Sequence, residues 1–451
     1  MKVSSIKIAS QYGLTLCLLI SCCFGACDAE PQQKDKLQPI DYPSLYRGSV
    51  EALTEAIVHD IFSPPVASRI YAYPGIAAHE TMAAQAKDQK NSLVGKLTDL
   101  QAIPPIPTQQ KTNFELASLK AFLTVGKTLV FSPVPLDRKE KEIIELFEAH
   151  GIPATTITQS LAYGDQVAQH IITWANQDNY AQTRTYSKHQ FERKAGRWMP
   201  TPPDFLDAIE PHWNKIRPFV LDSASQFAPE APTDYSVDKD SKFYKEMAEL
   251  YSYTQKLTDE EIEVAKFWDC NPFVTKHVGH YMEGVKKLTP GGHWIGLSLM
   301  ATEKKQMNFT QTIKTYTLTA ISIADAFISC WDEKYRSNLI RPETVINIHL
   351  DPDWKPSLIT PSFPEYPSGH SVASAAAAAM LTEIVGEDFA FRDSTEVAFG
   401  LPVRSFSSFT AAAEEAAISR FYGGIHYKPA IYNGLDQGKQ VGNFIVKKLV
   451  R

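Results

Sequence analysis

The chain has 451 residues, of which 44% are hydrophobic and 21% are charged. This composition is typical of a globular protein, and the length is sufficient for one large or two medium domains with a substantial core. The formal net charge of -6 provides no basic surface that would attract nucleic acid or an anionic membrane. A bound anion therefore requires a local cluster of cationic side chains.

The N-terminus predicts export. Lys2 and Lys7 precede an apolar run over residues 14–20, which is too short for a transmembrane span. We therefore interpret residues 1–27 as a signal peptide. No later segment offers the eighteen consecutive apolar residues of a membrane helix.

The end of this signal peptide predicts a lipid anchor. Cys22 and Cys27 each close a short sequence typical of bacterial lipoprotein processing, in which the cysteine becomes the acylated first residue. Simple cleavage near Ala26 or Ala29 is the alternative. In either case polar residues 28–45 would form a tether, and the protein would lie in the bacterial periplasm or at the outer-membrane surface. The lipid anchor would be its only attachment to the membrane.

Apolar residues of the remaining chain recur mostly with helical spacing, and clear strands are missing. We expect helices over residues 137–150 and 157–174 and after the capping-box sequence at Thr258. A proline-rich stretch at 178–243 predicts ordered surface loop. We therefore divide the chain into a helical and proline-rich loop region at 46–240 and a helical region at 241–451.

Two cations continue the apolar face of a predicted helix. Apolar residues follow one another by three or four positions from Ile313 to Trp331, and Lys334 is the next step. Arg341 lies two turns further on the same face if the helix continues that far. Buried cations are costly unless they are paired, so an anion in the core is their expected partner. The alternative is a pair of solvated cations at the wet end of the helix.

The sequence Pro367-Ser368-Gly369-His370 directly precedes an alanine-rich helical run at 371–384. Backbone N–H groups at a helix start, with glycine removing side-chain bulk, can bind an oxyanion, and the Ser368 hydroxyl adds a donor. Taken alone, this segment could also be only a turn and a helix cap.

The third segment, Ser419-Arg420-x5-His426, lies at the end of a predicted helix that begins near Ser408 and must break at Gly423. The guanidinium fork of Arg420 can hold two oxyanion oxygens at once. A neutral His426 offers one ring nitrogen as a nucleophile or a metal ligand.

Together the three segments read Lys-x6-Arg-Pro, Pro-Ser-Gly-His and Ser-Arg-x5-His, and they resemble the superfamily of vanadium-dependent haloperoxidases and type 2 phosphatidic acid phosphatases. The resemblance implies an all-α helical bundle that holds vanadate or phosphate. Carried over by motif, Lys334, Arg341 and Arg420 would neutralise the oxyanion oxygens. Ser368 and the amide of Gly369 would donate hydrogen bonds to them.

The resemblance also implies roles for the two histidines and two aromatic residues. His426 would bond the central atom, as the vanadium ligand in a haloperoxidase or as the nucleophile in a phosphatase, and His370 would be the acid–base group. Trp331 and Phe363 match a chloroperoxidase-type pattern in which aromatic side chains border vanadate and halide. These residues favour a peroxidase that oxidises halide with hydrogen peroxide.

Two alternatives remain open. A secreted acid phosphatase would hydrolyse a small phosphomonoester through a phosphohistidine in the same cage, and an oxyanion-binding lipoprotein would bind without turnover. The second is raised by Ala430, because the family pattern usually continues His-x3-Asp and the aspartate steadies the histidine ring. We expect Ala430→Asp to raise oxyanion affinity unless another group already orients His426.

Four further residues carry no recognisable motif. Cys270 and Cys330 lie 60 residues apart and fit no metal-binding spacing, so we expect small core residues. His293 is expected in core or loop packing, and Asp269 is a candidate partner for Arg420.

Overall fold

The computed structural model describes residues 38–86, 91–106, 111–272, 275–278, 280–284 and 286–451. The predicted signal peptide and residues 28–37 of the predicted tether lie outside this part of the chain. Residues 41–451 form one compact unit, which includes both the region at 46–240 and the region at 241–451. Residues 42–45, expected in the tether, instead form the start of the first helix, because Asp41 caps its first turn and Pro43 favours that position.

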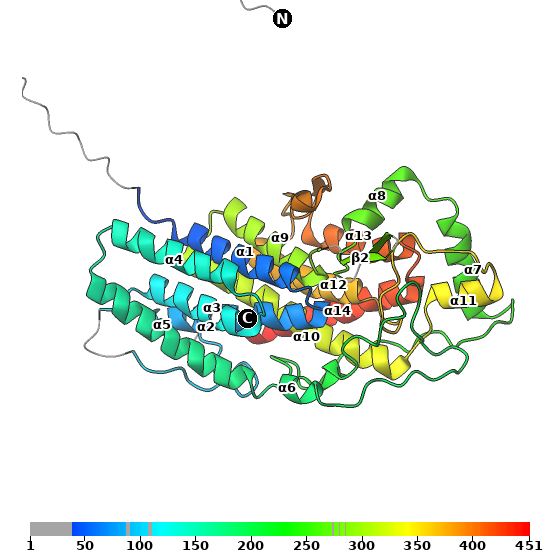
Figure 1. Ribbon diagram of the computed structural model, residues 1–451, viewed down its shortest axis with the longest axis horizontal. Coiled ribbons are helices and arrows are strands. Elements are labelled where there is room, and N and C mark those ends of the chain that lie inside the picture. Colours follow the sequence, from blue (N-terminus) through cyan, green and yellow to red (C-terminus); the bar gives the residue numbers. More distant parts are fainter. Residues whose placement is uncertain (1–37, 87–90, 107–110, 273–274, 279, 285) are drawn as a thin grey trace, which may run out of the picture. The chain divides into compact units, whose positions relative to one another are not determined.

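The prediction of an all-α protein is confirmed (Figure 1). The α-helices among the described residues are α1 (Tyr42–His59), α2 (Pro64–Ala86), α3 (Phe114–Leu129), α4 (Val134–Ala149), α5 (Ala154–Ala175), α6 (Tyr180–Thr183), α7 (Lys242–Thr254), α8 (Asp259–Phe267), α9 (Pro290–Lys304), α10 (Phe309–Ser337), α11 (Pro342–His349), α12 (Gly369–Val385), α13 (Phe409–Tyr422) and α14 (Lys428–Leu449). Short 3₁₀ helices are η1 (Trp213–Lys215) and η2 (Val397–Phe399). Strands β1 (Thr275–Val278) and β2 (Tyr281–Gly284) form one antiparallel pair, and β3 (Phe391–Asp393) and β4 (Arg404–Phe406) form another.

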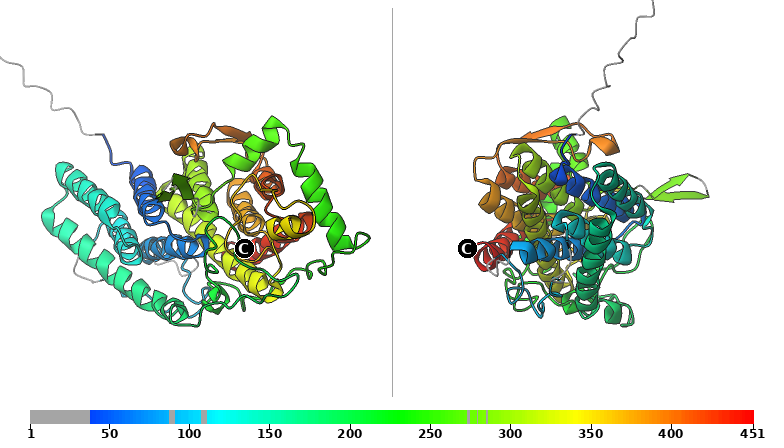
Figure 2. Two further views of the ribbon diagram at one scale, coloured as in Figure 1. Left: turned by 45° about the vertical axis from the view of Figure 1, so that its right-hand side comes forward. Right: turned by 90° about the vertical axis from the view of Figure 1, so that its left-hand side faces the viewer.

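Helix α10 joins the two halves of the bundle. It packs against α2 of the N-terminal half and against α9, α12 and α14 of the C-terminal half. Figure 2 shows the blue and cyan helices on one side of it and the orange and red helices on the other. Gly75 permits the close approach of α2, because a Cβ atom there would lie 2.7 Å from Cε1 of Tyr316.

The local helix signals are confirmed with small changes in their bounds. Helix α8 begins with the predicted capping box at Thr258, and α4 ends before Gly151, whose φ of +71° requires glycine. Helix α5 begins at Ala154, and Pro153 is its N-cap residue. Thr155 and Thr156 therefore lie in the first turn of the helix and do not cap it. None of the described helices is both long enough and apolar enough to cross a membrane.

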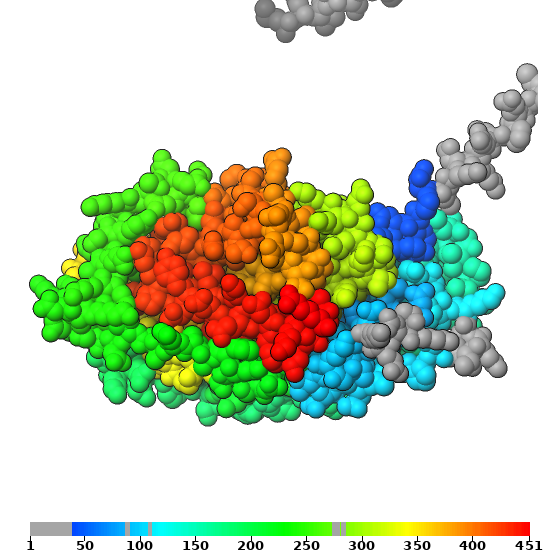
Figure 3. All heavy atoms as spheres, turned by 180° about the vertical axis from the view of Figure 1, so that it is seen from behind, coloured from blue at the N-terminus to red at the C-terminus, as the bar shows by residue number. Residues whose placement is uncertain are grey.

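The proline-rich stretch is ordered loop, as predicted, interrupted by α6 and η1. The carboxylate of Asp325 on α10 fixes its middle, because it accepts hydrogen bonds from the backbone amides of Phe219, Val220 and Leu221 at 2.7, 2.7 and 3.0 Å. In Figure 3 the green residues, which include part of this stretch, border the orange and red C-terminal helices.

The predicted apolar stripe of α10 is buried from Ile313 to Trp331, and Lys334 continues it into the core. Arg341 does not lie on this helix, because α10 ends at Ser337 and Asn338 adopts a left-handed conformation with φ +47°. Arg341 is instead the N-cap residue of α11. The chain therefore turns between the two cations rather than continuing along one face.

Candidate active site

The three motifs meet at a cavity of about 30 Å³. Its wall includes Trp331, Phe363, Gly369, His370 and His426, all of them predicted site residues. The remaining predicted residues are buried around it. These are Lys334, Arg341, Ser368 and Arg420.

His426 follows the break between α13 and α14 and is 3% exposed. Gly424 allows the turn with φ +76°, as the double glycine predicted. The ring's Nε2 lies 3.3 Å from Nη1 of Arg341. Burial, followed by the charges of Arg341 and Lys334, lowers the pKa of His426 well below its ordinary value, so the ring is neutral near pH 7.

Glu365 orients His426 in place of the aspartate that is missing at position 430. The Nδ1 atom of His426 lies 2.9 Å from Oε1 of Glu365, which also accepts the backbone N–H of Tyr427 at 2.9 Å. Because the carboxylate holds the proton on Nδ1, the lone pair of the neutral ring is on Nε2. Burial raises the pKa of Glu365 to about 7.

Ala430 is only 1% exposed, and its carbonyl accepts the N–H of Ser368 at 2.9 Å. Another acid thus already orients His426, which is the condition under which no gain in affinity is expected from Ala430→Asp. A second carboxylate at this buried position would also be costly. Sequence reasoning missed Glu365. The available signal was an acid between Pro364 and Tyr366, directly before the Ser-Gly-His motif.

Lys334 is fully buried and surrounded by carbonyl groups of the loop that leads into α12. Its Nζ donates to the carbonyls of Pro364, Glu365 and Pro367 at 3.0, 3.1 and 2.5 Å. The ammonium also lies 4.8 Å from the centre of the Phe363 ring. Burial lowers the pKa of Lys334 to about 7. Lys334 thus fixes the shape of the loop and supplies a positive charge that a bound anion would stabilise.

The guanidinium of Arg341 lies beside His426, at the same loop that Lys334 contacts. Its Nε donates to the carbonyl of Phe363 at 2.8 Å and its Nη1 to that of Ile425 at 2.9 Å. Burial lowers its pKa to about 10, so the group remains charged at neutral pH. Its Nη2 is buried without a hydrogen-bond partner among the described residues.

The start of α12 forms the predicted cradle. Ser368 is the N-cap residue, and its Oγ accepts the amide of Ser371 at 3.3 Å, which leaves the hydroxyl hydrogen for another acceptor. A Cβ atom on Gly369 would lie 3.4 Å from the Trp331 ring and would narrow the space beside the cavity. The helix begins at Gly369, two residues earlier than predicted, so this amide is one of the unpaired N–H groups of its first turn.

His370 occupies the first turn of α12 and is partly buried. Its ring makes a hydrogen bond to the backbone of Trp268, and its Nε2 has no partner within the described part of the chain. Burial and the charge of Arg420 lower the pKa of His370 well below its ordinary value. The neutral Nε2 can therefore accept a proton.

Arg420 lies in the last turn of α13 and is 1% exposed. Its Nε donates to Oγ of Ser419 at 2.9 Å and its Nη2 to the carbonyl of Ala265 at 3.1 Å. The suggested ion pair with Asp269 does not form. Asp269 instead pairs with Lys287 and acts on Arg420 only through its charge.

These residues fit a tetrahedral oxyanion. The unpartnered Nη2 of Arg341, the free hydroxyl hydrogen of Ser368 and the amide of Gly369 are donors, and buried positive charges surround them. The Nε2 atom of His426 supplies a lone pair in the same cavity. Residues in this arrangement can hold vanadate or phosphate.

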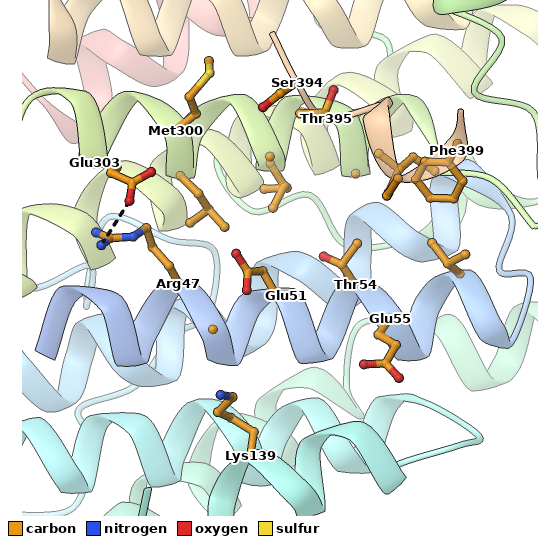
Figure 4. A pocket seen from close by; sticks show the side chains of 18 of the residues that line it. Arg47, Glu51, Thr54, Glu55, Lys139, Met300, Glu303, Ser394, Thr395 and Phe399 are labelled. Atoms are coloured by element: carbon orange, nitrogen blue, oxygen red, sulfur yellow. Dashed lines mark ion pairs between the residues drawn. The ribbon is translucent and has the colours of Figure 1, made fainter. Parts of the chain in front are cut away.

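A larger cavity, of about 910 Å³, lies away from this chemistry. Figure 4 shows it between α1, α9 and residues 394–399, with Arg47 of α1 and Glu303 of α9 forming an ion pair of 3.8 Å across it. None of the predicted site residues lines it. Size alone would therefore point to the wrong cavity.

Comparison with known proteins agrees with the geometry. The family described as the VCPO second helical-bundle domain matches residues 314–451. A crystal structure of a bacterial vanadium-dependent iodoperoxidase is 51% identical in sequence, with a TM-score of 0.86, and the match covers 91% of this chain and 98% of that one. None of the curated proteins matches this chain.

Two structures of bacterial vanadium-dependent chloroperoxidase share the fold at 17% identity. The holo form has a TM-score of 0.66 over 92% of this chain and 96% of that one, and the apo form has a TM-score of 0.62 over 86% and 94%. Because the much closer iodoperoxidase match extends over nearly all of both chains, this chain belongs to the vanadium-dependent haloperoxidase family.

Proposed function

We propose that this protein is a vanadate-dependent haloperoxidase that uses hydrogen peroxide to oxidise a halide. The observation that carries the proposal is the pair formed by Glu365 and His426, which keeps the lone pair of a buried, neutral imidazole on Nε2, beside Arg341 at the cavity. This is the form of histidine that ligates a metal. The absence of an aspartate at position 430 suggested an oxyanion-binding protein without turnover. The pair argues against this alternative, because Glu365 takes the role of that aspartate.

Bound vanadate supplies Lewis acidity, which activates hydrogen peroxide towards attack by a halide. The protein holds and neutralises this anion. Nη2 of Arg341, Oγ of Ser368 and the amide of Gly369 are donors to its oxygens, while Arg420 and Lys334 contribute charge. Because these groups are buried, their electrostatic effect on the anion is stronger than it would be in water.

His370 is the proposed acid–base group. Its neutral Nε2 lies at the cavity wall without a partner among the described residues, so it can take a proton from incoming hydrogen peroxide and later return it. The bond between the ring and the Trp268 backbone fixes its orientation. Trp331 and Phe363, whose ring centres lie 4.9 Å apart, form an apolar wall that limits the access of water.

Iodide is the proposed halide. The similar protein with 51% identity is described as an iodoperoxidase, and iodide is the halide that is most easily oxidised. The aromatic wall provides a polarisable surface suited to a large halide. The chloroperoxidase-type sequence pattern around Phe363 therefore does not require chloride as substrate.

Paired assays on one purified sample test the proposal. We expect triiodide formation with hydrogen peroxide only when orthovanadate is added, weaker bromination of a phenol dye, and negligible hydrolysis of p-nitrophenyl phosphate. Hydrolysis that vanadate inhibits, without halide oxidation, would instead identify an acid phosphatase. Tight phosphate binding with neither activity would identify an oxyanion-binding protein.

A further inference from the structure

A second set of potential metal ligands lies buried beside the oxyanion cavity. Cys270 follows α8, His293 lies in the first turn of α9, and Glu396 directly precedes η2. The Sγ atom of Cys270 is 3.6 Å from Nδ1 of His293 and 3.6 Å from Oε1 of Glu396, and the last two atoms are 3.0 Å apart. All three side chains are buried, and their ligand atoms come from distant parts of the sequence.

These separations are within about 0.3 Å of those expected around a single small cation. Ligands at about 2.0 to 2.3 Å in tetrahedral directions lie roughly 3.3 Å apart for nitrogen and oxygen and roughly 3.6 Å apart when one is sulfur. A thiolate disfavours calcium and magnesium, whereas zinc accepts sulfur, nitrogen and oxygen together. We propose that Cys270, His293 and Glu396 bind a zinc ion.

The surroundings of His293 support this assignment. Its other ring nitrogen, Nε2, lies 2.7 Å from Oδ2 of Asp393. Thr395 fixes that carboxylate by donating to Oδ1 from its amide at 2.9 Å and from its hydroxyl at 2.6 Å. A carboxylate on the far nitrogen is the usual outer partner of a metal-bound histidine, because it fixes the tautomer and increases the basicity of the ligand.

Binding requires the release of two protons, one from the thiol of Cys270 and one from Nδ1 of His293. Without a cation, an imidazolium at His293 can donate to both Glu396 and Asp393. With zinc, the divalent charge replaces the two protons, so the net charge of the cluster is unchanged. Burial therefore does not disfavour the replacement of the two protons by zinc. The metal-free state that competes with zinc binding is a hydrogen-bonded cluster of the same net charge.

The two cavities provide space and access. Cys270 lines the 30 Å³ cavity together with His370, which leaves room for a water as the fourth ligand. On the other side, Thr395, which is labelled in Figure 4, and Gly292 line the 910 Å³ cavity, so solvent reaches residues that adjoin the cluster. The zinc would fix the segment that carries Trp268, whose indole stacks on His293 at 4.5 Å and whose backbone bonds to His370.

Metal analysis of tag-free protein, equilibrated with zinc sulfate and desalted, tests the site. We expect one equivalent of zinc in the wild type and none in Cys270→Ala. Cobalt in place of zinc should give a thiolate-to-metal charge-transfer band that this variant lacks. His426→Ala is the matched control and should keep both signals, because it removes the vanadate ligand and leaves the cluster intact.

Two variants that preserve the size of the side chain test the site even if Cys270→Ala does not fold. Glu396→Gln should weaken zinc binding by at least about 100-fold, because a direct ligand is lost. Asp393→Asn should weaken it by about 10- to 100-fold, as expected for an outer partner. Substoichiometric zinc in the wild type, zinc retained in Cys270→Ala, or zinc lost in His426→Ala would overturn the proposal.

Discussion

Glu365 determines which nitrogen of His426 faces the cavity, and its removal tests that role directly. We expect Glu365→Gln to bind vanadate about 10- to 100-fold more weakly, because a neutral amide is a poorer acceptor for the Nδ1 proton. Titration of vanadate against halide oxidation, together with vanadium NMR of the bound ion, measures the change. Affinity equal to that of the wild type would show that the ring is oriented by other contacts.

Ala430→Asp is the companion variant. The carbonyl of Ala430 already accepts the Ser368 amide, and the side chain is buried, so we expect no gain in vanadate affinity and some loss of stability. A gain in affinity would mean that Glu365 does not satisfy the requirement of His426. Thermal unfolding of the same sample separates an effect on stability from an effect on the site.

The two histidines should have separable effects. His426→Ala should abolish vanadium binding, because it removes the only lone pair assigned to the metal. His370→Ala should retain binding but lower turnover by about 100-fold or more, as expected when an acid–base group is lost. Equal loss of binding in both variants would contradict these roles.

Lys334 should take up a proton when an oxyanion binds. Its pKa is lowered to about 7 by burial, so at about pH 8 most of the side chain is neutral until an anion favours the ammonium form. Vanadate affinity should therefore fall as pH rises above 7, more steeply than in Lys334→Met. Calorimetric titrations in buffers of different ionisation enthalpy should show up to about one more proton taken up by the wild type.

The sequence predicts the residues of the site that belong to motifs and misses those that do not. Lys334 stands out because a cation continues an apolar stripe, and Ser368 and Gly369 stand out because they precede a helix. Glu365 has no spacing that marks it, since its partner is 61 residues away. His293 and Cys270 likewise become a cluster only when α9 and the segment after α8 fold together.

At the scale of elements, the contact between α12 and α14 depends on glycine. A Cβ atom on Gly438 would lie 2.2 Å from the carbonyl oxygen of Val372 and 2.9 Å from Cβ of Ala375, so Gly438→Ala must push the helices apart. We expect a loss of about 2 kcal/mol in the free energy of unfolding from overpacking. Vanadate affinity should also fall, because the displacement separates His370 from His426.

Asp436→Ala, an exposed position on the same helix, is the control and should change neither quantity. Unchanged melting of Gly438→Ala would mean that α14 can shift without cost and would contradict the close packing. Chemical denaturation followed by circular dichroism makes the comparison.

Helices were the predictable elements, and their ends were less so. Apolar periodicity identifies α10 because its buried stripe is continuous, and the capping box at Thr258 marks the start of α8. The sequence does not predict the end of α10 at Ser337, because no proline or glycine precedes Pro342 in this segment. The helix ends because Asn338 adopts a left-handed conformation. Arg341 is therefore placed at the site by the turn between α10 and α11, which apolar periodicity does not predict.

At the scale of the whole molecule, the N-terminal helices are part of the catalytic unit. Helix α2 covers one side of α10, and Asp325 on α10 holds the proline-rich loop through three backbone amides. We therefore expect the protein to unfold in a single calorimetric transition whose calorimetric and van't Hoff enthalpies agree. Two separated transitions would instead support independent regions divided near residue 240.

The packing of α12 against α14 has a consequence for how the site responds to its ligand. His370 is in the first turn of α12, and His426 is two residues before α14. The two helices pack closely at Gly434, where an added Cβ atom would lie 3.1 Å from the carbonyl oxygen of Ser368. The two histidines thus belong to one preorganised body, whereas Lys334 and Arg341 contact the connecting segment 363–367 through its carbonyls. Hydrogen exchange should therefore slow on vanadate binding mainly in that segment and at the Gly369 amide, which is a proposed donor to the anion. The amides in the remainder of both helices should keep the same protection.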